Sequence, residues 1–287
     1  GIPHRVQTRC PLPLISMEQV TDWCRLWREL AENRNRDQQS RHDLWENRVH
    51  EFSERVKTRW SKPDSSRDFV IAQLDPTSTV LDIGAGTGMW TTLMAQRAAH
   101  VTALDPSAAM LNYLRQNLVE QNIANVSVIH GAWPDTPVER HDFSLCSHAM
   151  YGYPDFPRFI RQMIASTKRM CFLLLRAPRL DGLMAEASRQ LWGHPYDSPN
   201  AIIAYNCLLQ MNIFPNVLME NTGAWEARIS PSLEDALLSI KQHFRLATND
   251  EHDAFLIELL RRRLTPQNGG CVWPRETYSA LIYWTVG

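Results

Sequence analysis

Three glycines in the first third of the chain have the spacing of a ligand-binding turn. Gly84, Gly86 and Gly88 follow an apolar run from Val80 to Ile83 and precede a stretch with helical spacing. Glycine adopts positive φ freely and lets a ligand approach the backbone closely. The start of the following helix offers free N–H groups and a positive dipole end, which favour an anion. The turn therefore predicts a site for a ligand with a negatively charged group.

An acidic residue complements this turn. Asp105 ends the next apolar run and lies 17 residues after Gly88. A carboxylate at this place accepts hydrogen bonds from both hydroxyls of a ribose, and its charge strengthens them. The ordinary alternative is a tight turn without a ligand, with Asp105 as a helix cap before Pro106. The combination of strand, glycine turn, helix, strand and terminal acid favours a nucleoside-containing cofactor.

The glycine spacing also distinguishes between two candidate classes of cofactor. A dinucleotide fingerprint has the pattern Gly-x-Gly-x-x-Gly, whereas this chain has Gly-x-Gly-x-Gly. The turn also lies well inside the chain, after a helical segment, and the alternating elements end with a late strand. These features favour S-adenosylmethionine (SAM), and an NAD-dependent oxidoreductase is the more distant alternative.

Strands and helices alternate around the turn. Helices of ten or more residues are expected at 89–99, 108–122 and 156–167. Apolar strands separated in this way predict an α/β fold with a doubly wound, mostly parallel sheet covered on both faces. Ligands of such sheets bind at the carboxyl ends of the strands. The expected strands are 79–83, 100–104, 126–130, 143–147 and 169–175, with a last one at 278–286.

Additional segments flank this core. We expect an N-terminal helical cap over 1–67, with Ser16 as a helix cap, and a SAM-binding domain over 68–287 with an insertion at about 177–270. In the insertion, helices are expected at 180–191, 201–211, 232–244 and 250–264, and extended segments at 216–219 and 225–229. An insertion at this place commonly forms a lid over the substrate, although aromatic packing is the more common role of such residues. The candidate lid residues are Trp192, His194, Tyr196 and Asn206.

The composition excludes several classes of function. The formal net charge is −1, from 30 basic and 31 acidic residues, so no overall field attracts nucleic acid or an anionic membrane. There is no 18-residue apolar run and no signal peptide. The six cysteines form no Cys-x-x-Cys pair and, like the histidines, show no metal-ligand spacing. We therefore expect reduced cysteines, a cytoplasmic location and no metal.

Three segments resemble the class I SAM-dependent methyltransferases, in particular the broad type 11 group that acts on small molecules. The resemblance covers about 68–175. It implies a Rossmann-like seven-stranded sheet of order 3-2-1-4-5-7-6 with an antiparallel last strand, SAM as methyl donor and S-adenosylhomocysteine (SAH) as product. The segments are Val80–Gly88, Val101–Ser107 with Met110 and Leu111, and His141–His148.

The resemblance also implies a set of cofactor contacts. One departure concerns the third strand, where the family often has Gly-Asp and the acid binds the adenine amino group. Here Gly131-Ala132-Trp133 follows that strand, so adenine is expected to use backbone groups, stacking on Trp133, or Asp135. The expected contacts are Asp82, Gly84, Ala85, Gly86, Gly88, Asp105, Pro106, Met110, Ala132, Trp133 and Ser147.

The loop after the fourth strand is the best-placed segment for chemistry. Methyl transfer needs proximity, orientation and a dry pocket, and it needs a base only if the acceptor must lose a proton. We consider His148 as that base, with Tyr151 beside it as a second catalytic residue and Tyr153 as a further lining residue; all three have ordinary packing roles as alternatives. Cys146 lies within an apolar strand and is expected to be buried and inert.

The sequence thus predicts a methyltransferase that acts on a small-molecule acceptor. An RNA or protein methyltransferase is an alternative, which a basic groove leading to Gly84 would favour. A SAM-binding protein without transferase activity is another, because the acid after Gly131 is missing. No Asp/Asn-Pro-Pro-Tyr/Phe motif follows the fourth strand, which argues against methylation of DNA bases or release factors. Neither the acceptor nor the oligomeric state is predicted.

Overall fold

A seven-stranded sheet forms the centre of the protein. The computed structural model describes residues 21–36 and 42–287, so the expected cap at Ser16 lies outside the described residues. The strand order is β3-β2-β1-β4-β5-β10-β6; β1 to β5 are parallel, and β10 pairs antiparallel with β5 and β6. The predicted fold and strand order are confirmed. The bounds are β1 Thr79–Ile83, β2 His100–Asp105, β3 Val126–His130, β4 His141–Ser147, β5 Thr167–Pro178, β6 Asn216–Met219 and β10 Thr277–Thr285.

Apolar side chains bury both faces of this sheet. Along β5, Phe172 and Leu174 belong to one buried cluster, whereas Leu173 and Leu175 belong to another. Because successive side chains of a strand point to opposite faces, a continuous apolar run is needed where both faces are covered. This is why the central strands are apolar without interruption.

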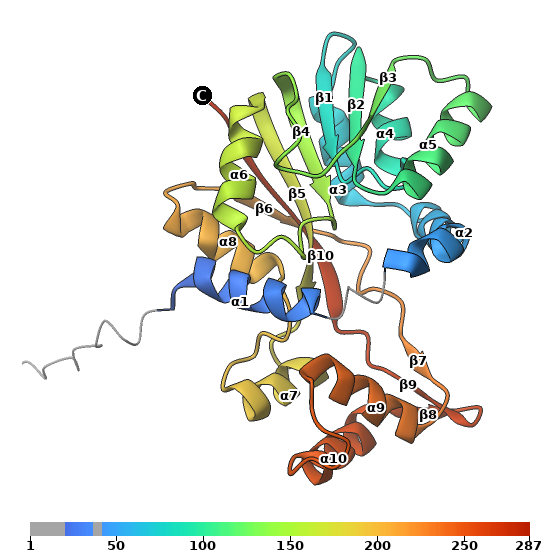
Figure 1. Ribbon diagram of the computed structural model, residues 1–287, viewed down its shortest axis with the longest axis vertical. Helices are drawn as coiled ribbons and strands as arrows, with labels where there is room; N and C mark the ends of the chain where they lie inside the picture. Colours follow the sequence, from blue (N-terminus) through green and yellow to red (C-terminus); the bar gives the residue numbers. More distant parts are fainter. Residues whose placement is uncertain (1–20, 37–41) are drawn as a thin grey trace, which may run out of the picture.

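Helices cover the two faces (Figure 1). Trp90 and Met94 of α4 pack into one cluster, whereas Phe159 and Met163 of α6 pack into the other. The first helix, α1, lies beside α8 and α6, and its N-cap is Asp22, whose side chain accepts a hydrogen bond from the Arg25 amide. The bounds are α1 Trp23–Asn35, α2 His42–Trp60, α3 Ser65–Gln73, α4 Met89–Ala95, α5 Ala108–Glu120, α6 Phe156–Ala165 and α8 Ala201–Gln210.

A smaller lobe lies beyond the carboxyl ends of β4 and β5, at the bottom of Figure 1. It has its own apolar core, which includes Leu183, Phe244 and Trp273. Extended structure was expected over 225–229, but the strand covers only Ile229–Ser230, and the hairpin of β8 and β9 was not predicted. The lobe comprises α7 Leu183–Trp192, β7 Ile229–Ser230, α9 Leu233–Phe244, α10 Asp253–Arg263, β8 Thr265–Gln267 and β9 Gly270–Val272.

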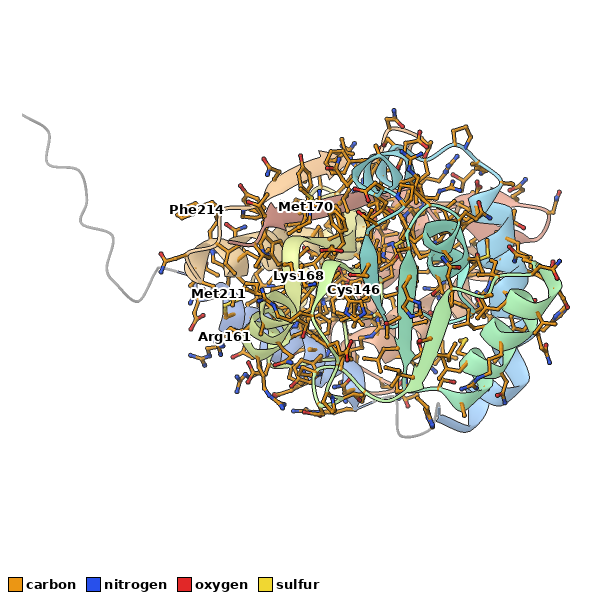
Figure 2. The ribbon with its side chains drawn as sticks, turned by 90° about the horizontal axis from the view of Figure 1, so that it is seen from above. Cys146, Arg161, Lys168, Met170, Met211 and Phe214 are labelled. Atoms are coloured by element: carbon orange, nitrogen blue, oxygen red, sulfur yellow. A yellow bond between two sulfur atoms is a disulfide. The ribbon has the colours of Figure 1, made fainter. Side chains whose placement is uncertain are left out.

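The expectation that all cysteines are reduced is wrong for two of them. Cys24 on α1 and Cys207 on α8 form a disulfide across 183 positions of sequence, a bond that is uncommon in a reducing compartment. Cys146 on β4 is a buried free thiol, as expected, and lies within the sheet in Figure 2. No helix in the described part of the chain has the length and apolarity to cross a membrane.

Candidate active site at the carboxyl ends of the strands

The glycine turn is tied to the neighbouring strand. The amides of Gly84 and Ala85 both donate to the carbonyl of Leu104, at 2.8 and 3.0 Å. Gly84, Gly86 and Gly88 have φ values of 72°, 56° and 90°, in the left-handed region that glycine occupies without strain. The turn thus leaves β1 sharply and opens α4.

The three glycines have different reasons for lacking a side chain. A Cβ on Gly84 would lie 2.3 Å from the Cβ of Ala149, and one on Gly88 would lie 2.0 Å from Cδ1 of Leu114. For a Cβ on Gly86, by contrast, no described atom lies within 4 Å. Gly84 and Gly88 therefore allow close packing within the protein, whereas Gly86 borders open space, which is what a bound cofactor requires.

Asp105 lies at the carboxyl end of β2, directly across from the turn. Its Oδ2 accepts a hydrogen bond from the Gly86 amide at 2.9 Å, and its Oδ1 accepts one from the Ser107 amide at 2.8 Å. Burial raises the pKa of Asp105, against the opposing effect of these two amides. A carboxylate has about four acceptor positions, so two remain available for ribose hydroxyls. The geometry fits the expected role.

Asp82 has a structural role in place of the expected cofactor contact. Its side chain is buried inside the protein and accepts a hydrogen bond from the Thr91 hydroxyl at 2.6 Å. Burial raises the pKa of Asp82 to about 7. The bond joins β1 to α4 and so holds the turn between them, while the carboxyl group faces the interior.

The segment after β3 corrects two expectations about adenine. The Trp133 side chain is buried, packs against Phe159 and donates from Nε1 to the Phe159 carbonyl at 3.3 Å, so its ring is not available for stacking. Asp135 is exposed and pairs with Arg158 at 2.5 Å. Ala132 is exposed and remains a candidate for a backbone contact.

The other expected contacts frame the same edge of the sheet. Pro106 is exposed directly after Asp105, and Met110 is buried in the first turn of α5. Ser147 is half-buried at the end of β4, where its backbone pairs with Leu174 of β5. These residues lie at the carboxyl ends of β2 and β4, on either side of the glycine turn.

His148 begins the loop after β4 with a left-handed φ of 55°. Its Nδ1 lies 2.7 Å from the Tyr151 hydroxyl, which also accepts a hydrogen bond from the Arg176 amide at 2.7 Å. Burial, with Arg59 and Arg176 nearby, lowers the pKa of His148 to about 3. The imidazole is therefore neutral near pH 7. The structure brings His148 and Tyr151 together, as the sequence suggested.

Two arginines and a tryptophan from distant segments surround this pair. The Trp225 ring lies 5.3 Å from the His148 ring, and the guanidinium carbon of Arg59 lies 4.4 Å from the centroid of Trp225. The guanidinium carbon of Arg176 lies 4.4 Å from the Tyr151 centroid. Sequence reasoning missed all three residues. A charged residue at the end of an apolar strand was the available signal for Arg176, whereas Arg59 and Trp225 had none.

A cleft of about 340 Å³ leads from this cluster into the smaller lobe. Arg176 and Trp225 line its end nearest the sheet, and Trp273 and His243 line it from the lobe. A larger groove of about 700 Å³ lies between α1, α6 and α8, where Figure 2 shows Arg161 and Met211. The cleft is the candidate acceptor site, because two of its lining residues, Arg176 and Trp225, contact the His148–Tyr151 pair.

The remaining candidates pack in ordinary ways. The Tyr153 hydroxyl accepts from Arg158 at 2.8 Å, and its ring contacts Phe159. In the insertion, Trp192 packs against Phe244, and Tyr196 packs against Trp23 of α1. Asn206 donates to the Ile202 carbonyl within α8. Burial raises the pKa of the Cys146 thiol far above its usual range, which agrees with an inert residue.

The sheet order, the glycine turn and the terminal acid are similar to those of class I SAM-dependent methyltransferases, and the site fits SAM as cofactor. The family model described as a methyltransferase domain matches residues 80–170, which include the turn, Asp105 and β4. The YcgJ protein of Bacillus subtilis has the same fold, with a TM-score of 0.51 and 17% identity, over 77% of this chain and 97% of that one. A Bacillus halodurans protein described as a methyltransferase has a TM-score of 0.51 and 14% identity, over 76% of this chain and 96% of that one.

Two curated relatives are similar to this chain over part of its length. A demethylmenaquinone methyltransferase of Listeria monocytogenes is 26% identical over 134 residues, which are 41% of this chain and 56% of the relative. The match thus spans little more than half of that enzyme. An uncharacterized protein of Haemophilus influenzae is 28% identical over 214 residues, 72% of this chain and 76% of the relative.

Proposed function

We propose that this protein methylates a small molecule that binds in the cleft beside β5. The observation that carries the proposal is the position of the cleft: Arg176 and Trp225 line it, and both contact the His148–Tyr151 pair at the carboxyl end of β4. The contact between Gly84 and Ala149 places this loop directly against the glycine turn. A cavity of about 340 Å³ is of the size that accepts a small molecule.

In this proposal, the turn and the acid hold the cofactor. Backbone N–H groups at the start of α4 would bind its carboxylate, and the open space beside Gly86 would admit it. Asp105 would bind the ribose hydroxyls, and the backbone of the exposed residue Ala132 is the candidate contact for adenine. SAM, when bound, supplies an electrophilic methyl group. The protein contributes orientation and exclusion of water.

His148 then has a different role from the expected base. The Tyr151 hydroxyl already accepts the Arg176 amide proton, so its own proton is available for Nδ1 of His148. This arrangement leaves the imidazole proton on Nε2, where it can serve as a hydrogen-bond donor. Tyr151 acts as a positioning residue for His148.

The domain division at residue 67 belongs to the same proposal, with α1 and α2 as helical additions to the methyltransferase core.

Binding of SAM and SAH by calorimetric titration tests the cofactor site. We expect the wild type to bind both, and Asp105→Asn to bind at least about tenfold more weakly, because the neutral amide loses charge-assisted hydrogen bonds. Asp68→Asn, at an exposed position on α3, serves as the matched control and should bind normally. Absence of SAM binding by the wild type would refute the proposed function.

Methyl transfer itself is tested with labelled SAM. The protein is incubated separately with a mixture of small metabolites and with total RNA. Label in the metabolite fraction supports the proposal. Label only in RNA supports the nucleic-acid alternative and contradicts the proposal, as does cofactor binding without transfer to either substrate.

A further inference from the structure

The acidic side chains that line the cleft are already paired within the protein. Three carboxylates border it, and each has a partner within the protein. The Glu276 carboxylate also accepts a hydrogen bond from the Leu183 amide at 2.7 Å. The pairs are Asp197 with His243 at 3.0 Å, Glu276 with Arg263 at 3.7 Å, and Glu226 with Lys62. Against the opposing effect of burial, the hydrogen bond from His243, with Arg176 nearby, lowers the pKa of Asp197.

Arg176 differs from the other arginines of the cleft. Its Nη2 is shielded from solvent but has no hydrogen-bond partner among the described residues. A buried guanidinium N–H without an acceptor is costly, and a bound ligand removes that cost. The other three arginines donate to protein atoms: Arg179 to Asp181, Arg228 to Ser239, and Arg275 to the carbonyls of Trp225 and Ala224.

The backbone fixes Arg176 in place. It lies on β5, where it pairs with Ser279 of β10, and its amide donates to the Tyr151 hydroxyl. The guanidinium stacks on the Tyr151 ring, so one face is covered while an edge remains for a ligand. A planar guanidinium binds carboxylate and phosphate groups through two parallel hydrogen bonds.

We propose that the methyl acceptor carries an acidic group, a carboxylate or a phosphate, and that Arg176 binds this group in the cleft. The inference rests on the proposed function, because it names the substrate class of the same site. The guanidinium of Arg59 lies over the Trp225 ring and adds to the positive field around His148. The acidic group fixes the orientation of the acceptor relative to the loop after β4.

The test uses simple aromatic probes, because Trp225 and Trp273 line the same cleft and favour a flat ring. Protein saturated with SAH is titrated with benzoate, phenyl phosphate and the neutral benzamide. We expect at least one anion to bind about tenfold or more tightly than benzamide. The tighter of the two anions identifies the acidic group as carboxylate or phosphate.

Arg176→Gln should abolish this preference, with a loss of about tenfold to a hundredfold in affinity for the anion. Arg176→Lys should give an intermediate affinity, because it keeps the charge but loses the planar fork. Arg179→Gln is the matched control: it also lines the cleft but pairs with Asp181, and it should keep the preference. Thermal unfolding and SAH affinity show that each variant is folded.

The inference is overturned if benzamide binds as tightly as both anions, if no probe binds at millimolar concentration, or if folded Arg176→Gln keeps the preference. These outcomes differ from failure of the proposed function. If the wild type does not bind SAH, the cofactor site is wrong. If SAH binds but no anion preference appears, only the assignment of the acceptor class is wrong.

Discussion

Substitution of Gly86 separates backbone strain from loss of ligand space. In Gly86→Ala the new methyl group meets no described atom within 4 Å, so no clash within the protein is expected. The φ of 56° costs an L-residue about 1–2 kcal/mol, which lowers the melting temperature by a few degrees in a chain of this size. If the open space belongs to SAM, the same methyl group also occupies cofactor volume.

Gly193 provides the matched control for this experiment. It ends α7 with a φ of 79°, and no described atom lies within 4 Å of its added Cβ. We expect similar losses of thermal stability for Gly86→Ala and Gly193→Ala, but a loss of SAM affinity of at least about tenfold only for the former. Titration of the folded variants with SAM measures this difference in affinity. Wild-type affinity in Gly86→Ala, or an equal loss in both variants, would show that the space beside Gly86 does not hold the cofactor.

Two further substitutions test how the site is supported. Burial raises the pKa of Asp82 to about 7, so the folded state binds the proton of this carboxyl group more tightly than the unfolded state does. The resulting contribution of Asp82 to stability is complete below about pH 4 and is lost as the pH rises through 7. Between pH 4 and pH 8, the free energy of unfolding of Asp82→Asn, measured in urea, should therefore rise by up to roughly 4 kcal/mol relative to that of the wild type. If the two proteins show the same dependence of stability on pH, this reasoning is contradicted. Cys207→Ser should lower the free energy of unfolding by about 2–4 kcal/mol, as should reduction of the wild type, and unchanged stability would show that the bond to Cys24 contributes nothing.

The fold was predictable because its signals are local. Each central strand is a short apolar run, and each helix that follows begins at a capping residue or a glycine turn, so the alternation is visible without tertiary information. The order of the strands came from the resemblance to a family. The smaller lobe was harder to predict, because β7 has two residues and β8 three, too few for a side-chain period to show.

The candidate site also has a part that was predictable from the sequence and a part that was not. The glycine turn and Asp105 belong to one continuous segment, so their spacing carried the prediction. Trp133 and Asp82 were assigned from position alone, and position does not tell whether a side chain faces the open edge or the core. Arg176 and Trp225 come from segments far apart in sequence, and only the packing of the lobe against β5 and β10 brings them together.

Strand pairing fixes the proposed cofactor turn relative to the proposed acceptor cleft. β1, β4 and β5 are neighbours in the sheet, with Ile83 beside Cys146 and Ser147 beside Leu174. The turn after β1, the loop after β4 and Arg176 on β5 therefore keep fixed relative positions. The hydrogen bonds from Arg176 through Tyr151 to His148 extend this rigid array to the cleft. Because transfer requires the donor and acceptor atoms to be aligned, an acceptor held by Arg176 is oriented by the same backbone that holds the cofactor.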